Sequence, residues 1–304
     1  MRPVAVVAFA HSELDGQSPW DDVELTQKVC SKVREQVGLE QRDIGFTVSG
    51  SSDFLSGRPF SFVSALDGVG AFPPIQESHV EMDGAFALYE AWVRLQHGDI
   101  DTALVYAFGQ ASLGDLNRVL GLQMDPHWAA PLGLDEEAVA GLQAAARGLS
   151  GSVDRVPLSD GAAAIILAAG DRVLELNEQP AWIRGIEHRI DCSELSQRDL
   201  TQLNSAQACA KALDLAQYKI EQAELHFNFE QQRELLKESL ELADDVPINR
   251  GVSSHVDAYM VSGLLRIGEA ARAVMCGSVS TSLAHASAGP AMQQNLVCVL
   301  GAKP

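Results

Sequence analysis

The sequence predicts an α/β fold made of two consecutive halves, each with a largely parallel sheet and helical crossovers. Short apolar runs with strand character alternate with stretches of helical spacing, and a second set of such elements follows the first. With 304 residues and 46% hydrophobic content, the chain is long enough for two domains of ordinary size. We place their boundary after residue 170, which gives halves of residues 1–170 and 171–304.

In the first half, the alternation of elements has a βαβαβαβ order. The expected strands are Val4–Phe9, Ile44–Ser49, His79–Met82, Thr102–Phe108 and Ser159–Ala169, and the expected helices are Asp21–Val37, Phe60–Val69 and Gly84–Gln96. Residues 112–157 interrupt this order and contain an alanine-rich helical stretch at Glu136–Ala146. We interpret them as an excursion of the chain over the sheet.

The second half repeats the plan without visible similarity of its residues. The expected strands are Trp182–Arg189, Glu224–Phe229, Ser282–Ala286 and Leu296–Leu300, and the expected helices are Thr201–Ala216, Gln231–Ala243 and Met260–Val274. Each half therefore ends in a pair of strands.

Charge and cysteine usage exclude several classes of protein. The formal charge of −19 repels nucleic acid and anionic membrane surfaces, so neither is an expected partner. The five cysteines are scattered without metal-ligand or disulfide spacing, which predicts no metal site and fits a reducing compartment. The apolar run at the N-terminus is short, and we interpret it as a buried strand rather than a signal peptide. A cytoplasmic location is expected.

The most informative motif is His79-Val-Glu-Met-Asp-Gly-Ala-Phe, which continues as an amphipathic stretch to Gly98. It resembles the motif of lipid-transfer-protein (SCP2-type) thiolases, in which Val-Glu and two small residues precede Cys-Ala-Ser-Gly and a long helix. Three further passages carry the same resemblance: Leu158–Ala169, Asn249–Ala273 and Ala284–Leu300. The last of these is similar to the steroid-associated branch. The resemblance implies the thiolase fold, with two βαβαβαββ halves in a layered αβαβα arrangement.

The resemblance also indicates that thiolase chemistry is lost. Gly84 falls at the position of the nucleophilic cysteine and has no side chain that could form an acyl-enzyme. The family's polarising histidine falls near Asp257, with His255 or Tyr259 as alternative occupants of that space. The second cysteine falls near Ser287, two residues after His285.

One branch of the superfamily lacks the same cysteine and cleaves steroid side chains by a retro-aldol reaction of a β-hydroxy acyl-CoA. Such a reaction needs a base, an acid and donors that hold the departing enolate. His226 stands where these aldolases have a tyrosine, and Tyr259 approximately matches a second one. The resemblance thus implies His226, Tyr259, Asp257 and His285 as catalytic residues, and Gly84, Ser287, Gly289 and His255 as substrate-binding residues. The backbone N–H of Gly84, expected at a helix start, is the candidate enolate donor. No cofactor is expected beyond the CoA of the substrate.

Each candidate also has a purely structural interpretation. Gly84 could be a close-packing glycine, His226 a strand histidine with a backbone partner, and Asp257 a helix cap. Tyr259 could pack a loop, and His285 and Ser287 could shape the turn before Gly289-Pro290. Asp83 and Glu81 could be helix-entrance charges without chemistry. Phe86 replaces a small serine of the family and could block the acyl tunnel.

Two function classes remain open. In the first, the chain is the aldolase subunit for a steroid or another bulky acyl-CoA. In the second, it is a non-catalytic subunit that pairs with an active thiolase paralogue. The resemblance implies a zinc-ribbon/OB-fold (DUF35-type) partner in either case, and a homodimer or heterodimer formed through the strand expected at Ser78–Met82.

Overall fold

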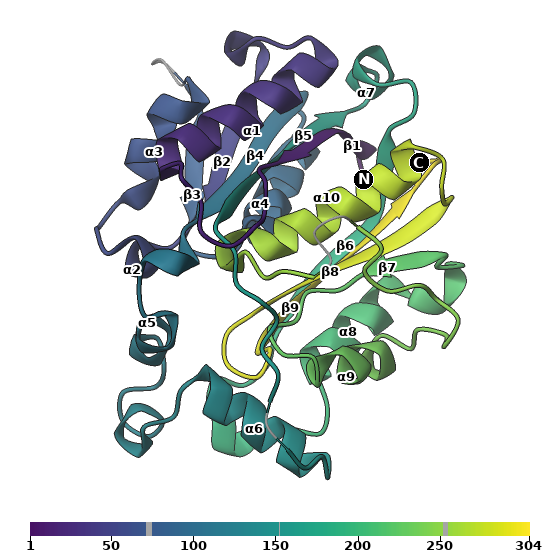
Figure 1. Cartoon of the computed structure of the whole chain (residues 1–304). Helices are drawn as coiled ribbons and strands as arrows, with labels where there is room; N and C mark the ends of the chain where they lie inside the picture. The colour runs from purple at the N-terminus through teal and green to yellow at the C-terminus, as the bar shows by residue number, and fades with distance from the viewer. Residues whose placement is uncertain (71–74, 152, 252–254) are drawn as a thin grey trace.

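A computed structural model describes residues 1–70, 75–151, 153–251 and 255–304. Within these residues, nine strands form one continuous sheet in the order β3-β2-β4-β5-β1-β6-β9-β8-β7 (Figure 1). The strands are β1 (Val4–His11), β2 (Phe46–Gly50), β3 (Glu77–Val80), β4 (Thr102–Gly109), β5 (Gly161–Ala169), β6 (Ala181–Ile190), β7 (Gln222–Glu224), β8 (Thr281–Ala288) and β9 (Gln294–Gly301). The first five strands and the last four meet where β1 pairs with β6.

The sheet is mixed, so the prediction of a largely parallel sheet is wrong. Parallel pairing is found for β2 with β3 and β4, and for β7 with β8. The pairs β4–β5, β1–β5, β1–β6, β6–β9 and β8–β9 are antiparallel. The pair β8–β9 is joined by a short turn, and a connection of that length allows only antiparallel pairing.

The helices of the first half are α1 (Asp22–Val37), α2 (Asp53–Ser56), α3 (Ser61–Val69) and α4 (Gly84–Gln96). Those of the excursion and of the connection between the halves are α5 (Leu116–Leu122), α6 (Glu136–Ala146) and α7 (Arg172–Leu176). The second half has α8 (Asn204–Leu213), α9 (Gln232–Ser239) and α10 (Ser262–Met275). All the helices expected from the sequence are present, most of them trimmed at their ends.

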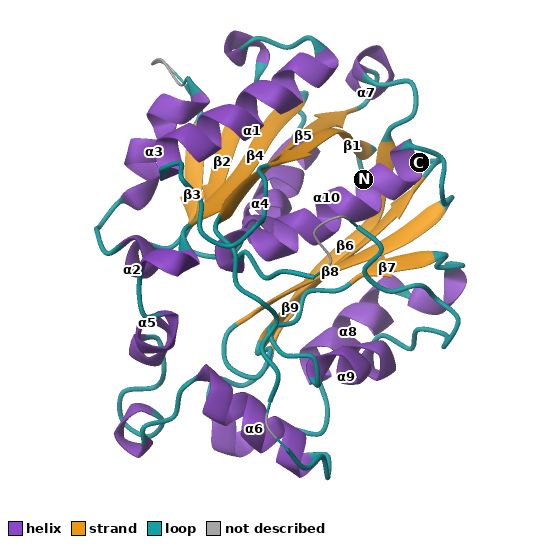
Figure 2. Cartoon of the chain, in the orientation of Figure 1, coloured by secondary structure: helices purple, strands orange, loops and turns teal. Residues whose placement is uncertain are grey.

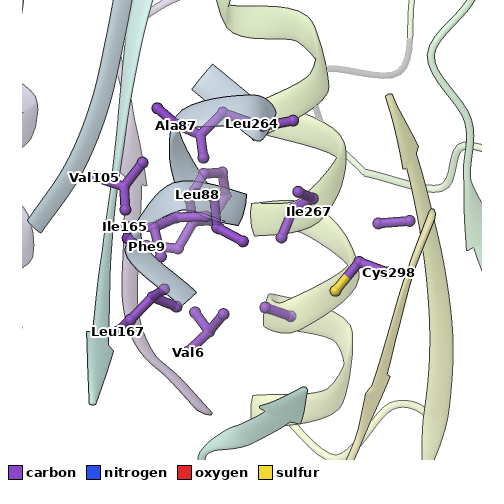
Figure 3. Packing of buried hydrophobic residues seen from close by; sticks show 14 of the residues in the cluster. Val6, Phe9, Ala87, Leu88, Val105, Ile165, Leu167, Leu264, Ile267 and Cys298 are labelled. Carbon is purple, nitrogen blue, oxygen red and sulfur yellow. The ribbon is translucent and has the colours of Figure 1, made fainter. Parts of the chain in front are cut away.

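The helices form three layers that alternate with the two parts of the sheet (Figure 2). Helices α1 and α3 cover the outer face of the first five strands, and α8 and α9 cover the outer face of the last four. Helices α4 and α10 lie between the two parts, where Leu88 and Ile267 pack with Val6 and Ile165 (Figure 3). This αβαβα arrangement confirms the predicted fold class.

The two halves differ where the first has β3. In the second half, only an isolated parallel bridge between Ala223 and Ile248 occupies that place. The next residue, Asn249, has a left-handed backbone with a φ of 51°. Its side-chain amide accepts a hydrogen bond from the N–H of Leu225 at 2.6 Å and donates one to the Leu225 carbonyl at 3.0 Å. The strand predicted at Glu224–Phe229 therefore stops at Glu224, because a side chain replaces the next strand residue as partner.

The expected strand at His79–Met82 is also shifted, and β3 ends at Val80. The following residues turn into α4, whose N-cap is Asp83. In the residues that the structure describes, no helix is long and apolar enough to cross a membrane.

Candidate active site

A cavity of about 280 Å³ lies where the entrances of α4 and α10 face the loops after β7 and β8. Helices α5 and α6 of the excursion supply another part of its wall. Four of the predicted site residues line it: His226, Tyr259, Ser287 and Gly289. Glu81, Asp83, Glu136 and Asn228 also line it, and the sequence did not indicate chemistry for any of them.

His226 lies two residues after the end of β7 and is 4% exposed. Its Nδ1 faces the backbone N–H of Ser287 at 3.4 Å, and its carbonyl accepts the Ser287 hydroxyl at 3.3 Å. Its Nε2 is 3.7 Å from Oδ1 of Asp257 and has no hydrogen-bond partner among the described residues. The imidazole is thus fixed through Nδ1, and in this tautomer the neutral ring carries its proton on Nε2, beside the Asp257 carboxylate.

Asp257 is held on the loop that precedes α10 by backbone hydrogen bonds to Pro157 at 2.8 Å and from Ser159 at 2.9 Å. Its Oδ1 accepts the Tyr259 N–H at 2.9 Å and the Ser262 hydroxyl at 2.7 Å. Burial alone would raise the pKa of Asp257, but the interactions with His226, the Ser262 hydroxyl and the charge of Arg155 together outweigh it, and the pKa lies below its usual value. Asp257 therefore both fixes the turn into α10 and remains an anion beside His226.

Tyr259 begins the 3₁₀ turn Tyr259–Val261 with a φ of 40°. A left-handed backbone is unfavourable for a bulky residue, and such strain is concentrated at functional sites. Burial raises the pKa of its phenol, and the charges of Glu136 and Asp257 raise it further. The hydroxyl therefore stays protonated near neutral pH and can act as a donor.

Two other candidates do not line the cavity. His285 lies within β8, fully buried, with its Nε2 2.7 Å from Oδ1 of Asn295. Burial lowers the pKa of His285 to about 4, so that its ring is neutral near pH 7. His255 lies in an exposed turn.

Gly84 is the first residue of α4 and is buried away from the cavity. A Cβ atom at this position would lie 2.5 Å from Cβ of Ala107 and 2.9 Å from Cδ2 of Leu264. The position at which the sequence resemblance places a nucleophile is therefore packed closed, in addition to having no side chain. Phe86 is buried against the ring of His188, with centroids 5.0 Å apart, and leaves the cavity open.

Asp83 connects the two central helices. Its Oδ1 accepts the N–H groups of Ala85 at 2.8 Å and Leu264 at 3.1 Å, and its Oδ2 accepts that of Gly263 at 2.8 Å. One carboxylate thus caps α4 and α10 together. Burial raises the pKa of Asp83 to about 6, although the charge of His226 and the three backbone donors act in the opposite direction. The sequence marks the cap of α4, but nothing in it indicates that the same oxygens reach a helix 180 residues away.

Glu136 extends from the first turn of α6 to the cavity wall. One carboxylate oxygen pairs with the guanidinium of Arg155, and the other accepts Nδ2 of Asn228 at 2.6 Å. Sequence reasoning missed this residue because it treated the excursion only as a connection, although binding residues are often carried by such segments. Among the described residues, no three His, Cys, Asp or Glu side chains converge as ligands for a metal ion.

No protein-family model matches the chain, and a search of curated proteins finds no match. Among solved structures, human mitochondrial 3-ketoacyl-CoA thiolase superposes with a TM-score of 0.76 at 12% identity. The superposition covers 100% of this chain and 99% of that one. The chain therefore has the thiolase fold over its whole length, and this likeness concerns the fold alone.

Proposed function

We propose that the protein is a thiolase-like carbon–carbon lyase that cleaves a β-hydroxy acyl-CoA by a retro-aldol reaction without an acyl-enzyme. A steroid or another bulky acyl group is the proposed substrate. The observation that carries this proposal is the arrangement of His226 and Tyr259 on one cavity, where Nε2 of His226 lies 3.7 Å from Oδ1 of Asp257 and has no hydrogen bond from the described residues.

The residues divide the proton transfers between them. Nε2 of His226 takes the proton of the β-hydroxyl group in the tautomer that carries the ring proton on Nδ1, so substrate binding has to break the long 3.4 Å contact from the Ser287 N–H to Nδ1. The electron pair of the broken carbon–carbon bond leaves on the thioester as an enolate. The nearby Asp257 carboxylate stabilises the imidazolium that forms. Tyr259 then donates its proton to the α-carbon of the enolate. The products are a carbonyl compound and a shortened acyl-CoA, and proton return from His226 to Tyr259 restores the enzyme.

Assembly is part of the proposal. Strand β3 is at the edge of the sheet and pairs with β2 on one side only, which leaves a row of backbone groups for a second copy or a paralogue. We also propose that a zinc-ribbon/OB-fold protein binds this dimer as a further subunit. Light scattering at micromolar concentration should give a dimer, and a stable monomer would contradict this assembly.

The activity is tested with the purified protein and its co-purifying partner on β-hydroxy acyl-CoA esters that carry a branched tertiary carbinol. His226→Ala and Tyr259→Phe should each lower the rate about 10²- to 10⁴-fold, the usual contribution of general acid–base catalysis. His255→Ala, in an exposed turn outside the cavity, is the matched control and should retain the rate. Absence of cleavage for the whole panel would refute the lyase function.

A non-catalytic role beside an active paralogue is the second candidate, and Asp83 favours it. The N-termini of α4 and α10, which could stabilise an oxyanion, already hold this carboxylate. In that role, a thiolase paralogue would be active only in the presence of this chain, and His226→Ala would leave its rate unchanged.

A further inference from the structure

The charge of the cavity wall has a consequence for the ligand. Glu81, Asp83 and Glu136 line the cavity, whereas no lysine or arginine is among its described lining residues. The phosphate groups of CoA need cationic or N–H donors, so only the uncharged pantetheine arm and the acyl group suit this space. The selectivity of the cavity therefore acts on the acyl group.

The three carboxylates differ in their capacity for a ligand. Asp83 accepts three backbone N–H groups from both central helices, which leaves one acceptor position on Oδ2. Glu81 lies at the exposed rim, where one oxygen accepts the N–H of Asp53 at 2.6 Å. Glu136 is mostly buried, and each of its oxygens has one protein partner. A carboxylate oxygen can accept two hydrogen bonds, which leaves Glu136 free to accept a donor from the cavity.

Two further polar atoms near Glu136, one on Asn228 and one on His226, have no hydrogen-bond partner among the described residues. Oδ1 of Asn228 is buried and has no hydrogen bond from the described residues, because its amide nitrogen is directed to Glu136. Nε2 of His226, in a side chain more than nine-tenths buried, is likewise without a hydrogen bond there. Because Nδ1 of His226 accepts the Ser287 N–H, Nε2 carries the ring proton, whereas Oδ1 of Asn228 is an acceptor. Buried polar atoms are normally satisfied, so a ligand that suits this cavity brings a donor to Asn228 and an acceptor to His226, and a hydroxyl group supplies both.

We infer that the acyl group held in this cavity carries a hydroxyl or amino group and no carboxylate at its far end, and that Glu136 determines this preference. The inference rests on the proposed acyl-CoA function. A donor group can bind Glu136 and Asn228 together, whereas a second carboxylate meets like charge in a partly desolvated wall. Arg155 does not reverse the effect, because it lies behind Glu136 and does not line the cavity.

The test compares two CoA esters of equal chain length, ω-hydroxyhexanoyl-CoA and adipoyl-CoA, by isothermal titration calorimetry. The hydroxy ester should bind at least about tenfold more tightly to the wild type, a difference of about 1.4 kcal/mol. Glu136→Gln should reduce this ratio to near unity or invert it, because the variant removes the negative charge of the wall while Arg155 behind it keeps its positive charge. Glu137→Gln, at the exposed neighbouring position outside the cavity, should keep the wild-type ratio.

A second variant covers the case in which Glu136→Gln does not fold. Glu81→Gln, at the cavity rim, should lower the ratio in the same direction but by less. Equal binding of the two esters to the wild type, or an unchanged ratio in both variants, would overturn the inference. If neither ester binds, the acyl-CoA function is refuted. The charge preference of the cavity is then measured by NMR with hexylamine and hexanoate. Equal or stronger binding of hexanoate would overturn the inference that the cavity disfavours a carboxylate.

Discussion

Helices α4 and α10 occupy equivalent places in the two halves and lie side by side in the middle layer (Figure 3). They differ in the residues that they bury and in what lies at their N-terminal ends. The buried residues of α4 are apolar, and its entrance at Gly84 has no room for a side chain. Helix α10 buries Arg266 and Glu269, and the loop before it brings Tyr259 to the cavity and Asp257 beside His226. In this duplicated fold, packing is concentrated at one helix entrance and candidate chemistry at the other.

The largest expected effect concerns the charged interior of α10. Arg266 lies 3.7 Å from the buried carboxylate of Glu224, and Glu269 is on the same helix. Arg266→Met would leave both carboxylates without this cation and should lower the free energy of unfolding by about 3–5 kcal/mol. Arg172→Met, which breaks an exposed pair with Glu175 on α7, should cost about 0–1 kcal/mol in the same urea titration. An equal loss of unfolding free energy in the two variants would mean that the buried ion pair of α10 contributes no more to stability than an exposed pair.

The next effect concerns the carboxylate that joins the two helices. The pKa of Asp83 is raised from 3.8 to about 6, so its contribution to stability is fully present below pH 3.8 and is lost as the pH rises through 6. A shift of roughly two units corresponds to about 3 kcal/mol. Urea unfolding at pH 4 and pH 7 should therefore show this loss in the wild type relative to Asp83→Asn.

The matched control for this titration is Asp135→Asn, the same substitution at the more exposed cap of α6. It should cost about 1 kcal/mol through the lost cap, without the pH-dependent difference seen for Asp83. If Asp83→Asn follows the wild type in parallel at both pH values, burial does not raise the pKa of Asp83 in the folded protein.

A smaller effect is expected at the entrance of α4. Gly84→Ala should destabilise the protein by about 1–3 kcal/mol, because its Cβ would overlap Ala107 and Leu264. Gly141→Ala, within α6 and with open space around it, should instead stabilise by up to about 1 kcal/mol. Thermal unfolding compares the two variants, and a tolerated alanine at Gly84 would show that this entrance is not tightly packed.

Gly84→Cys should give no acyl adduct by mass spectrometry.

The sequence predicted what depends on local pattern. The helix at Gly84–Gln96 has the predicted bounds, and the strand at Thr102–Phe108 is one residue longer. Features that depend on distant residues were missed: β7 is shortened by the side chain of Asn249, and Asp83 reaches the start of α10. Periodicity cannot reveal such contacts, because both residues have an ordinary local interpretation as turn and cap.

In the site, too, residues with a local sequence signal were predicted and residues that meet only through the fold were missed. His226 and Tyr259 could be selected from the sequence by their resemblance to family positions, and both line the cavity. Glu136 and Asn228 could not, because they are 92 residues apart and meet only through the path of the excursion. Catalytic roles for His226, Tyr259, Asp257 and His285 stay predictions.

The isolated bridge at Ile248 makes the two ends of the sheet unequal. Strand β3 offers an extended edge, whereas the opposite end is β7, which is three residues long and passes directly into the loop of His226. Two copies joined through β3 would present only β7 at both outer ends, and so short a strand is a poor template for a further chain. The shortening that brings His226 to the cavity would thus also stop sheet growth at two subunits and protect the protein from fibre formation.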